Sequence, residues 1–381
     1  MAPLIRVGLI GLSSSAKTSW ASSAHLPYLL SPTGSAKFEI VALLNSSVDA
    51  AKSAIVHYKL PASTRAYGNP DDLAADPDVD LVVCNTRVDK HHETIRPSVA
   101  AGKLVYSEWP LTQDVEHTKD LYNLAKEKGT LHKTVVGVQG GVTTLAEKLR
   151  EVLAEGRIGK VLSVEVISSG GVNDRDTLPT YLSYFTERKI GGNPFTIGFA
   201  HLFDFVQSVN GDVSSIKSTV QLQRPLNKII DKATGEVVET KQSDVPDLIH
   251  VQGKLADSPN TAKDATINFR FRKGQPFPGD WETVWTVVGE KGELRVTSPG
   301  AALQVASNSD QIAIKLHDFA KSGELEEIKW KFDDWQLELP VPARNVGKVY
   351  EAIAKGGGYP TFELALKRHE QLQEILGDWK A

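Results

Sequence analysis

The chain has 381 residues, and because soluble domains usually run to about 100–200 residues, its length predicts two domains. Its 43 basic and 47 acidic residues give a formal net charge of −4 with no basic block, which argues against direct contact with nucleic acid. The single cysteine, Cys84, excludes an intramolecular disulfide and a cysteine-rich zinc site.

The first third of the chain predicts alternating strands and helices. Nearly continuous apolar runs are typical of strands buried on both faces, and helical patterns lie between them. Such alternation predicts an α/β domain with a doubly wound parallel sheet, which binds ligands at the carboxyl ends of its strands. The strands are expected at residues 5–10, 38–44, 81–83, 104–106 and 135–138.

Near residue 140 the pattern changes. Thr144 and Glu147 predict a capping box that opens a helix, and Gly156 ends it. Strand-like segments then predominate, and residues 289–292 predict a hairpin turn. We therefore expect domains at 1–140 and 141–381, the second an α+β domain with a large, open-faced, mainly antiparallel sheet. A final helix at about 362–376 either stays in this domain or packs back on the first. The strands are expected at 161–167, 219–222, 249–255, 265–272, 283–288 and 293–296.

The first predicted strand ends in a glycine turn. Gly11 stands where the dinucleotide fingerprint G-x-G-x-x-G begins, but Ser13 occupies its second glycine position. The last position falls on Ala16, which the fingerprint tolerates. The alternative interpretation is a strand followed by a polar loop that binds no dinucleotide. The place of the turn at the start of a strand–helix–strand pattern favours a site for a dinucleotide pyrophosphate.

The end of the second predicted strand bears on which dinucleotide is bound. A site for NAD usually has Asp or Glu there to hold the ribose 2′-hydroxyl, whereas this chain has Asn45 and then Ser46. Asn45 can bind a ribose without repelling a 2′-phosphate, so the expected cofactor is NADP or NAD, with a slight preference for NADP. A strand-end turn without a ligand explains Asn45 and Ser46 equally well.

Short segments spread over nearly the whole chain resemble the Gfo/Idh/MocA oxidoreductase family. Within it, they are most similar to the branch that includes the fungal galactose-regulon repressor. Their order and spacing carry the resemblance together. The segments are 7–12, 20–21, 25–27, 86–91, 101–111, 138–140, 155–159, 246–247, 252–253, 289–294 and 359–362.

The resemblance implies an N-terminal Rossmann domain followed by an open-faced sheet that forms a homodimer interface. A sheet face rich in β-branched and aromatic residues would need such a cover. The resemblance also implies which residues bind the cofactor: Gly11, Leu12, Ser13, Ser14, Asn45, Ser46, Thr86, Arg87, His91, Glu108, Trp109 and Gln139.

Two of the three catalytic groups that the resemblance implies are replaced. Trp109 stands where the family has lysine, and Ile197 stands where it has aspartate, four residues before His201. Hydride transfer from an alcohol needs a base, and His201 is the retained candidate, the alternative being a histidine packed in the second domain. Tyr184 and Lys189 are weaker candidates for a replacement acid, since such residues more often lie at the surface or in packing.

Two functions remain open at this point. The first is an NAD(P)-dependent oxidoreductase, or a related cofactor-assisted enzyme, acting on a sugar, polyol or small carbonyl metabolite. The second is a non-catalytic, dinucleotide-binding transcriptional regulator that acts through a protein partner. We favour the enzyme because folds of this kind are mostly catalytic. No metal site is expected, since His91 and His92 are adjacent and no carboxylate has a ligand spacing.

The N-terminal segment and the length of the apolar runs bear on the cellular localisation of the protein. The start lacks a basic segment followed by a long apolar core, so no signal peptide is expected. The longest apolar runs are far shorter than the roughly 20 residues that span a bilayer, so no membrane association is expected. We expect a cytoplasmic protein, or a nuclear one if it is regulatory.

Overall fold

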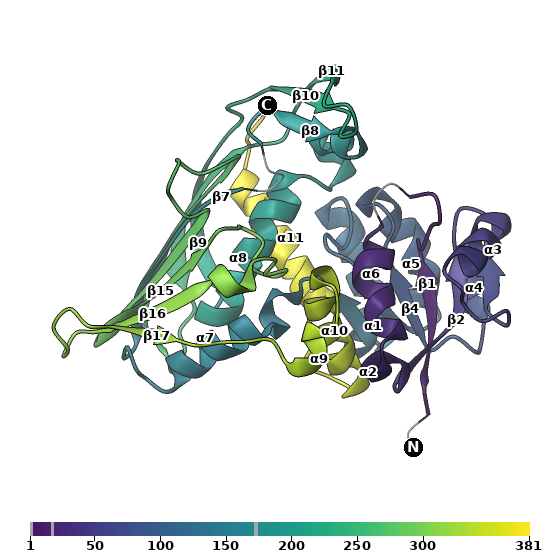
Figure 1. Cartoon of the computed structure of the whole chain (residues 1–381), viewed down its shortest axis with the longest axis horizontal. Coiled ribbons are helices and arrows are strands. Elements are labelled where there is room, and N and C mark those ends of the chain that lie inside the picture. Colours follow the sequence, from purple (N-terminus) through teal and green to yellow (C-terminus); the bar gives the residue numbers. More distant parts are fainter. Residues whose placement is uncertain (1–2, 17–18, 171–173) are drawn as a thin grey trace. The chain divides into compact units, whose positions relative to one another are not determined.

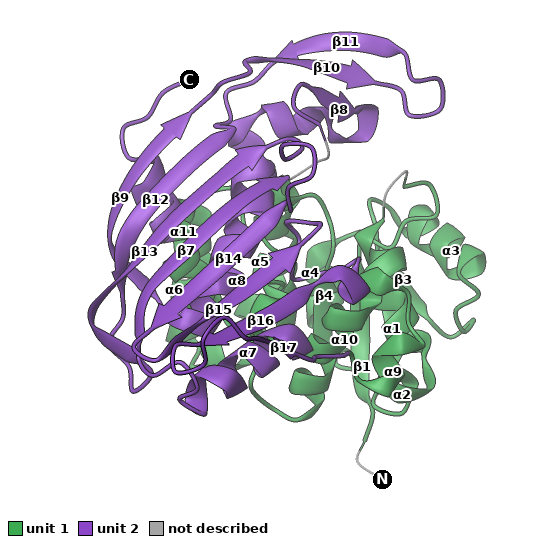
Figure 2. Cartoon of the chain, turned by 60° about the vertical axis from the view of Figure 1, so that its left-hand side comes forward, with its two compact units in different colours: residues 1–142, 332–369 green, residues 143–331, 370–381 purple. Residues whose placement is uncertain are grey.

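Figure 1 shows the computed structural model of the chain, which describes residues 3–16, 19–170 and 174–381. The chain packs into two compact units (Figure 2). Unit 1 comprises Met1–Val142 and Phe332–His369, and unit 2 comprises Thr143–Lys331 and Glu370–Ala381. The segment 332–369, which the sequence placed in the second domain, therefore packs with unit 1.

Unit 1 is built on a six-stranded parallel sheet, which confirms the predicted doubly wound architecture. The strand order is β3-β2-β1-β4-β5-β6, so the direction of winding reverses between β1 and β4. In such sheets the reversal opens a crevice at the carboxyl ends of the strands. The strands are β1 (Ile5–Ile10), β2 (Phe38–Leu44), β3 (Arg65–Tyr67), β4 (Leu81–Cys84), β5 (Leu104–Ser107) and β6 (Thr134–Val136).

Helices of unit 1 come from both ends of the chain. Val7 and Leu9 of β1 share one apolar core with Val346 and Val349 of α10, so the late helix completes the cover of the sheet. The helices are η1 (Ala21–His25), α1 (Leu26–Leu30), α2 (Pro32–Ser35), α3 (Val48–His57), α4 (Pro70–Ala75), η2 (Val88–Lys90), α5 (His91–Ala100), α6 (Val115–Glu127), η3 (Leu131–Lys133), η4 (Gln139–Val142), α9 (Asp334–Leu337) and α10 (Val341–Ala354).

Unit 2 is built on an eight-stranded sheet in the order β17-β16-β15-β14-β7-β13-β12-β9. All its pairs are antiparallel except β7 with β13, which confirms a mainly antiparallel sheet. A smaller sheet has the order β11-β10-β8. The strands are β7 (Val161–Gly170), β8 (Thr177–Pro179), β9 (Val213–Gln221), β10 (Leu226–Ile230), β11 (Val237–Gln242), β12 (Leu248–Leu255), β13 (Thr261–Lys273), β14 (Thr283–Gly289), β15 (Gly292–Ser298), β16 (Ala313–Asp318) and β17 (Leu325–Ile328).

One face of the large sheet is covered by helices and the other is open. Phe199 and Phe203 stand over Phe269 of β13 with ring centroids 5.4 and 5.6 Å apart, and Phe205 meets Trp285 of β14. The helical elements are α7 (Thr144–Ala154), η5 (Thr180–Thr186), η6 (Arg188–Ile190), η7 (Pro194–Phe199), α8 (Ala200–Asn210), η8 (Ser309–Gln311) and α11 (Phe362–Leu376), the last shared between the two units.

The start of α7 corrects one sequence prediction. The capping residue is Thr143, whose hydroxyl accepts a hydrogen bond from the N–H of Ala146. Thr144 is already the first helical residue, so the predicted capping box with Glu147 is not formed. Two successive threonines made the position ambiguous by one residue.

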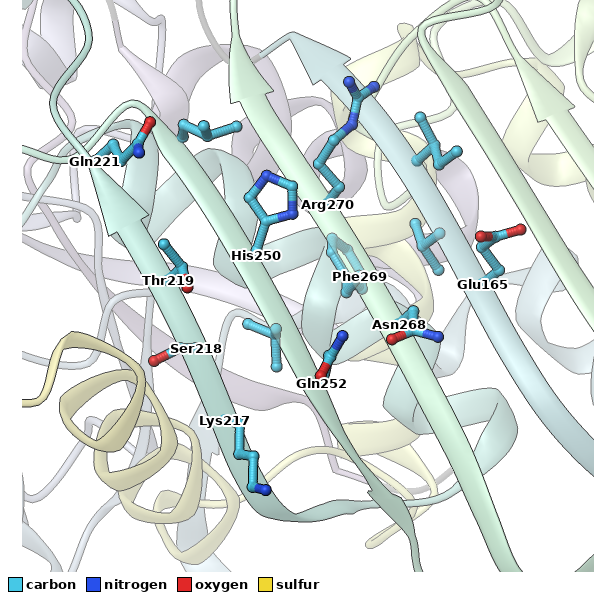
Figure 3. Close-up of a pocket in the computed structure, with 14 residues that line it drawn as sticks. Glu165, Lys217, Ser218, Thr219, Gln221, His250, Gln252, Asn268, Phe269 and Arg270 are labelled. Atoms are coloured by element: carbon cyan, nitrogen blue, oxygen red, sulfur yellow. The ribbon is translucent and has the colours of Figure 1, made fainter.

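The open face is more polar than the sequence led us to expect. A groove of about 560 Å³ lies along β9, β12, β13 and β7 (Figure 3). One row across these strands is polar throughout, because register places four polar residues side by side: Lys217, Gln252, Asn268 and Glu165. Among the described residues, no helix combines the length and the apolar character needed to cross a membrane.

Candidate functional site at the strand ends of unit 1

Five residues form one row across the carboxyl edge of the parallel sheet. Each directly follows the last residue of a strand, and those last residues are paired in register. Neighbouring strands lie about 4.8 Å apart, so the first four residues of the row span about 14 Å. In order across β2, β1, β4, β5 and β6, the row is Asn45, Gly11, Asn85, Glu108 and Gly137.

The glycine of the row is required by its surroundings. Gly11 has a φ of +85°, and a Cβ there would lie 3.0 Å from the backbone carbon of Asn85. The carbonyl oxygens of Leu12 and Ser13 accept hydrogen bonds of 2.9 Å from the Asn45 amide and the Tyr58 hydroxyl. Because Gly11 has no side chain, the backbone of the loop can approach a ligand in the crevice closely. Two carbonyls of the loop already accept hydrogen bonds within the protein, so its N–H groups can bind an anion.

Asn45 has a structural task at the end of β2. Its side-chain nitrogen donates to the carbonyls of Leu12 and Ala50, which ties the glycine loop to the start of α3. Ser47 caps that helix by accepting from the N–H of Ala50, while Ser14 and Ser46 are exposed at the same edge. The residue directly after β2 is therefore not a carboxylate. The groups at this edge that could bind a ligand are serine hydroxyls and the N-terminus of α3.

Thr86 and Arg87 begin the loop after β4, and His91 lies beneath it. His91 is 2% exposed, and its ring nitrogens lie 2.9 Å from the Thr86 carbonyl and 3.0 Å from the Pro110 carbonyl. Burial lowers the pKa of His91, so the ring is neutral near pH 7. A neutral imidazole carries a single N–H, so His91 donates to one of these two carbonyls and packs beneath both loops. Arg87 is exposed and donates two hydrogen bonds to Asp89.

Glu108 is held from behind by a buried histidine. Its Oε1 lies 2.9 Å from Nε2 of His25, whose Nδ1 lies 2.8 Å from the hydroxyl of Tyr350 on α10. A Cβ at Gly137 would come within 2.7 Å of the Glu108 carboxylate, so the last residue of the row is a glycine because the carboxylate lies against it.

Trp109 fills the position of the expected lysine with an apolar ring. It is 5% exposed, and its ring centroid lies 4.7 Å from that of His369 on α11. Burial lowers the pKa of His369 to about 4, against a smaller opposing effect of Asp114. The position after Glu108 therefore has an indole in contact with a neutral imidazole, where a lysine would have placed an ammonium group.

Two side-chain amides near the row have unused hydrogen-bonding atoms. Both amide atoms of Asn85 and the Oε1 atom of Gln139 are buried without a hydrogen-bond partner. Buried polar atoms without partners are costly and call for an explanation. Together with the bare approach at Gly11, they fit a site whose polar partner is a bound dinucleotide.

The three catalytic candidates of the second domain lie in unit 2. His201 is 8% exposed in the first turn of α8, and Tyr184 packs against Phe185 with ring centroids 5.0 Å apart. Lys189 has a 78% exposed side chain and an ion pair of 3.3 Å with Glu187. Of the three, His201 combines burial with a titratable ring, and Lys189 belongs to the surface.

Cys84 and the histidine-rich segments carry no further chemistry in this site. Burial raises the pKa of the Cys84 thiol to about 11, so it is protonated at neutral pH and acts as a packing residue of β4. In the part of the chain that the structure describes, no group of three or more His, Cys, Asp or Glu residues is placed to hold a metal.

Sequence reasoning missed several residues of the site. The sequence does not show that the Asn85 amide is buried without a hydrogen-bond partner, because its burial depends on the loops around it. His25 and Tyr350 are 325 residues apart, and His369 comes from the last helix, so no local pattern could join them to Glu108 and Trp109.

Comparison with known proteins places these features in a family context. Residues 5–135 match the model of the oxidoreductase family with an NAD-binding Rossmann fold, Gfo/Idh/MocA, and residues 145–298 match the C-terminal domain of Gal80p. The dehydrogenase aclE of Aspergillus oryzae is 26% identical over 306 residues, which cover 78% of each chain. The galactose/lactose metabolism regulatory protein GAL80 of Saccharomyces cerevisiae is 24% identical over 80% of this chain and 69% of its own.

Solved structures show the same fold at lower identity. A super-repressor mutant of Gal80p from Saccharomyces cerevisiae superposes with a TM-score of 0.82 and 22% identity, covering 98% of this chain and 95% of its own. Levoglucosan dehydrogenase in complex with NADH and L-sorbose has a TM-score of 0.73 and 16% identity, with the same coverage.

The strand order and the glycine turn define unit 1 as a Rossmann domain of the dinucleotide-binding class. Over residues 5–135 the chain is similar to the Gfo/Idh/MocA oxidoreductase family, and over residues 145–298 it is similar to the C-terminal domain of Gal80p.

Proposed function

We propose that the chain is an NAD(P)-dependent oxidoreductase that acts on a sugar, polyol or small carbonyl metabolite. The row of strand ends in unit 1 carries this proposal. In this proposal Gly11, at the reversal point of the sheet, would hold the pyrophosphate, Asn45 would lie on the adenosine side, and Asn85 and Glu108 would lie on the nicotinamide side.

When bound, the dinucleotide takes or gives the hydride, and the chain's residues do the rest. Gly11 and its loop bind the pyrophosphate, and Asn85 and Gln139 offer their unpartnered amide atoms. His201 takes the hydroxyl proton of the substrate in the oxidative direction, while Trp109, which cannot transfer a proton, walls the nicotinamide side. A cofactor edge without a carboxylate after β2 admits NADP as well as NAD.

Titration of the protein with NADH and NADPH tests the binding step. Gly11→Ala should weaken binding at least about tenfold, because the new Cβ meets the Asn85 backbone and the positive φ disfavours a side chain. Gly357→Ala is the matched control, since no heavy atom lies within 4 Å of its Cβ position. If the unaltered protein binds neither dinucleotide, the proposed function is wrong.

Turnover with a panel of sugars, polyols and small carbonyl compounds tests the chemical step. His201→Ala should lower kcat by roughly 10²–10⁴-fold while dinucleotide binding persists. Unchanged turnover in this variant would remove His201 from the mechanism, with Tyr184 and then Lys189 as the next residues to replace.

The alternative function is a non-catalytic, dinucleotide-binding regulator that acts through a protein partner. The apolar Trp109–His369 contact in place of a catalytic ammonium favours it, as does the similarity to GAL80. It predicts dinucleotide binding without turnover over the whole panel, whereas any turnover above the free cofactor background decides for the enzyme.

We also propose that the open sheet face of unit 2 binds a second copy of the chain. The polar row across the groove is self-complementary: Lys217 stands at one end and Glu165 at the other, with Gln252 and Asn268 between them (Figure 3). A two-fold axis through the middle of the row sets Lys217 against the partner's Glu165, and the two amides against each other.

A further inference from the structure

His25 and Tyr350, which lie behind Glu108, have no role in the reaction proposed above, and they form a hydrogen-bonded triad with it. His25 and Tyr350 are fully buried, and Glu108 has a side chain 14% exposed. This hydrogen-bonded triad joins helix η1, the end of β5 and helix α10. Nε2 of His25 lies 2.9 Å from Oε1 of Glu108, and Nδ1 of His25 lies 2.8 Å from the hydroxyl of Tyr350.

The donors and acceptors of this hydrogen-bonded triad follow from the carboxylate of Glu108, which can only accept. Nε2 of His25 therefore carries a hydrogen and donates it to Glu108. In the neutral ring, Nδ1 then accepts from the hydroxyl of Tyr350. That hydroxyl keeps its proton, because burial, with a smaller effect of the Glu108 charge, raises the pKa of Tyr350 well above its usual range.

Packing fixes the orientation of this hydrogen-bonded triad. The His25 ring lies 5.3 Å from the Tyr106 ring and 5.7 Å from the Tyr350 ring, so aromatic neighbours on β5 and α10 hold it. On the other side, the absence of a Cβ at Gly137 gives the Glu108 carboxylate its place. The carboxylate is thus held from two sides at the edge of the sheet.

The place of Glu108 in the row indicates what it binds. A pyrophosphate at Gly11 has one ribose toward Asn45 and the other toward Asn85 and Glu108. A charged carboxylate is the acceptor that proteins use for ribose hydroxyls. Asn45 cannot supply one on the adenosine side, so Glu108 supplies the carboxylate of this row.

We infer that His25 and Tyr350 are positioning residues, which hold the Glu108 carboxylate oriented toward the hydroxyls of the nicotinamide-side ribose. The inference rests on the proposed binding of a dinucleotide. It adds that the strength of this binding is set by two residues that do not touch the cofactor.

Two substitutions of His25 differ in which partner they can reach. His25→Gln places an amide nitrogen near the former Nε2 position and keeps a donor for Glu108. His25→Asn is shorter and reaches only toward Tyr350. We expect His25→Asn to weaken NADH binding by about 10- to 100-fold, the value of a lost hydrogen bond to a charged group, and His25→Gln to recover most of it.

A tyrosine pair supplies the matched control within the same aromatic cluster. Tyr350→Phe removes the hydroxyl that donates to Nδ1 of His25. Tyr28→Phe removes a hydroxyl from the ring stacked on it at 5.2 Å, but that hydroxyl donates to Glu351 instead. Tyr350→Phe should weaken NADH binding and Tyr28→Phe should leave it unchanged, with thermal unfolding measured for both.

The outcomes are distinct. If the unaltered protein binds NADH and the rescue by His25→Gln and the tyrosine difference are both seen, the inference is supported. Equal effects of Tyr350→Phe and Tyr28→Phe, or unchanged binding in Glu108→Gln, would overturn it while the proposed function stands. Absence of binding in the unaltered protein would overturn both.

Discussion

Trp109 and His369 show how a single replaced residue changes its neighbourhood. A lysine after Glu108 would bring an ammonium group to the carboxyl edge of the sheet, whereas the indole brings apolar surface that His369 covers. The imidazole is then neutral near pH 7, because burial disfavours its charged form. The same replacement that removes a catalytic cation thus creates a buried neutral histidine.

This histidine predicts a pH-dependent stability. Its pKa is about 4 in the folded protein and about 6.5 in the unfolded chain, so the unfolded chain binds the extra proton between these values. Stability should therefore fall as the pH drops from about 6.5 toward about 4, by on the order of 3 kcal/mol from this residue. Urea unfolding at several pH values measures it.

The matched variants are His369→Phe and His57→Phe. The first removes the titrating ring and should make the pH profile of the unfolding midpoint shallower, while the second replaces an exposed histidine and should leave the profile as it is. Identical profiles for all three proteins would contradict the assignment to His369.

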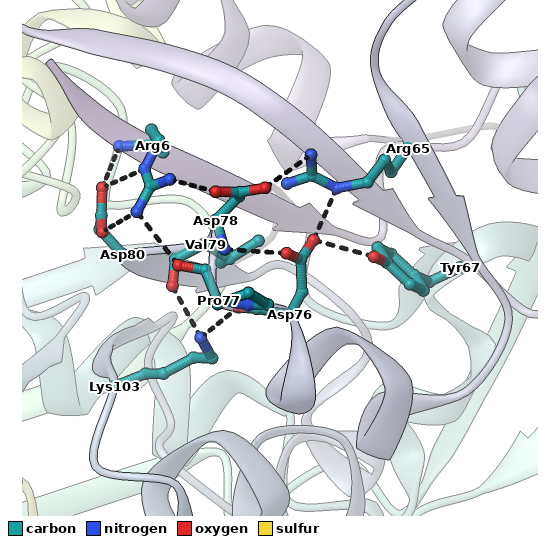
Figure 4. A network of polar contacts seen from close by, with 9 residues as sticks. All are labelled: Arg6, Arg65, Tyr67, Asp76, Pro77, Asp78, Val79, Asp80 and Lys103. Carbon is teal, nitrogen blue, oxygen red and sulfur yellow. Dashed lines mark hydrogen bonds and ion pairs between the residues drawn. The ribbon is translucent and has the colours of Figure 1, made fainter.

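The loop before β4 is the clearest example of an element held by charge. Three aspartates in the segment 76–80 form ion pairs with Arg6 of β1 and Arg65 of β3 (Figure 4). Asp76 is 7% exposed and accepts from Arg65 at 2.7 Å, from Tyr67 at 2.8 Å and from the N–H of Asp78. Lys103 donates to two backbone carbonyls of the same loop.

Asp76→Asn should cost about 1–3 kcal/mol of unfolding free energy, because buried donors lose a charged acceptor. Burial alone would raise the pKa of Asp76, but its three donors outweigh burial and lower it. The stabilisation is therefore present above about pH 3.8 and is lost as the pH falls through the folded pKa. Asp78→Asn, at a 58% exposed side chain, is the control and should cost at most about 1 kcal/mol in urea unfolding at neutral pH.

The success of prediction differed between elements for physical reasons. Strands β1, β2, β4 and β5 were found because strands buried on both faces are continuous apolar runs. The edge strands β3, β11 and β17 were missed, since they are short or largely exposed and carry no such run. Strand β16, which alternates, was also missed.

The candidate site was predicted unevenly for a related reason. Gly11 and Asn45 follow apolar runs, so a pattern along the chain marks them, whereas Glu108 was predicted from the resemblance to the family. His25, Tyr350 and His369 meet the site only through tertiary packing, which no spacing along the chain records.

At the scale of the whole molecule, the open sheet predicts the state of assembly. A dimer through the row of Lys217 and Glu165 should dissociate when either charge is reversed, because like charges then meet across the two-fold axis. Glu165→Lys and Lys217→Glu should each shift the mass measured by light scattering toward the monomer.

The double variant with both charges exchanged restores the complementarity and should restore the dimer. A dimer that survives both single reversals would place the interface elsewhere, and a monomeric unaltered protein would contradict the proposed assembly.

The return of residues 332–369 to unit 1 has a consequence for synthesis of the protein. Because domains generally fold as they leave the ribosome, the main part of unit 2, Thr143–Lys331, is synthesised while the Rossmann domain still lacks α10. Until Tyr350 emerges, Tyr28 has no stacking partner and Nδ1 of His25 has no donor. A chain cut after Val142 would contain all six strands of the sheet but expose this aromatic cluster to water, so the Rossmann domain lacks part of its core until α10 has been made.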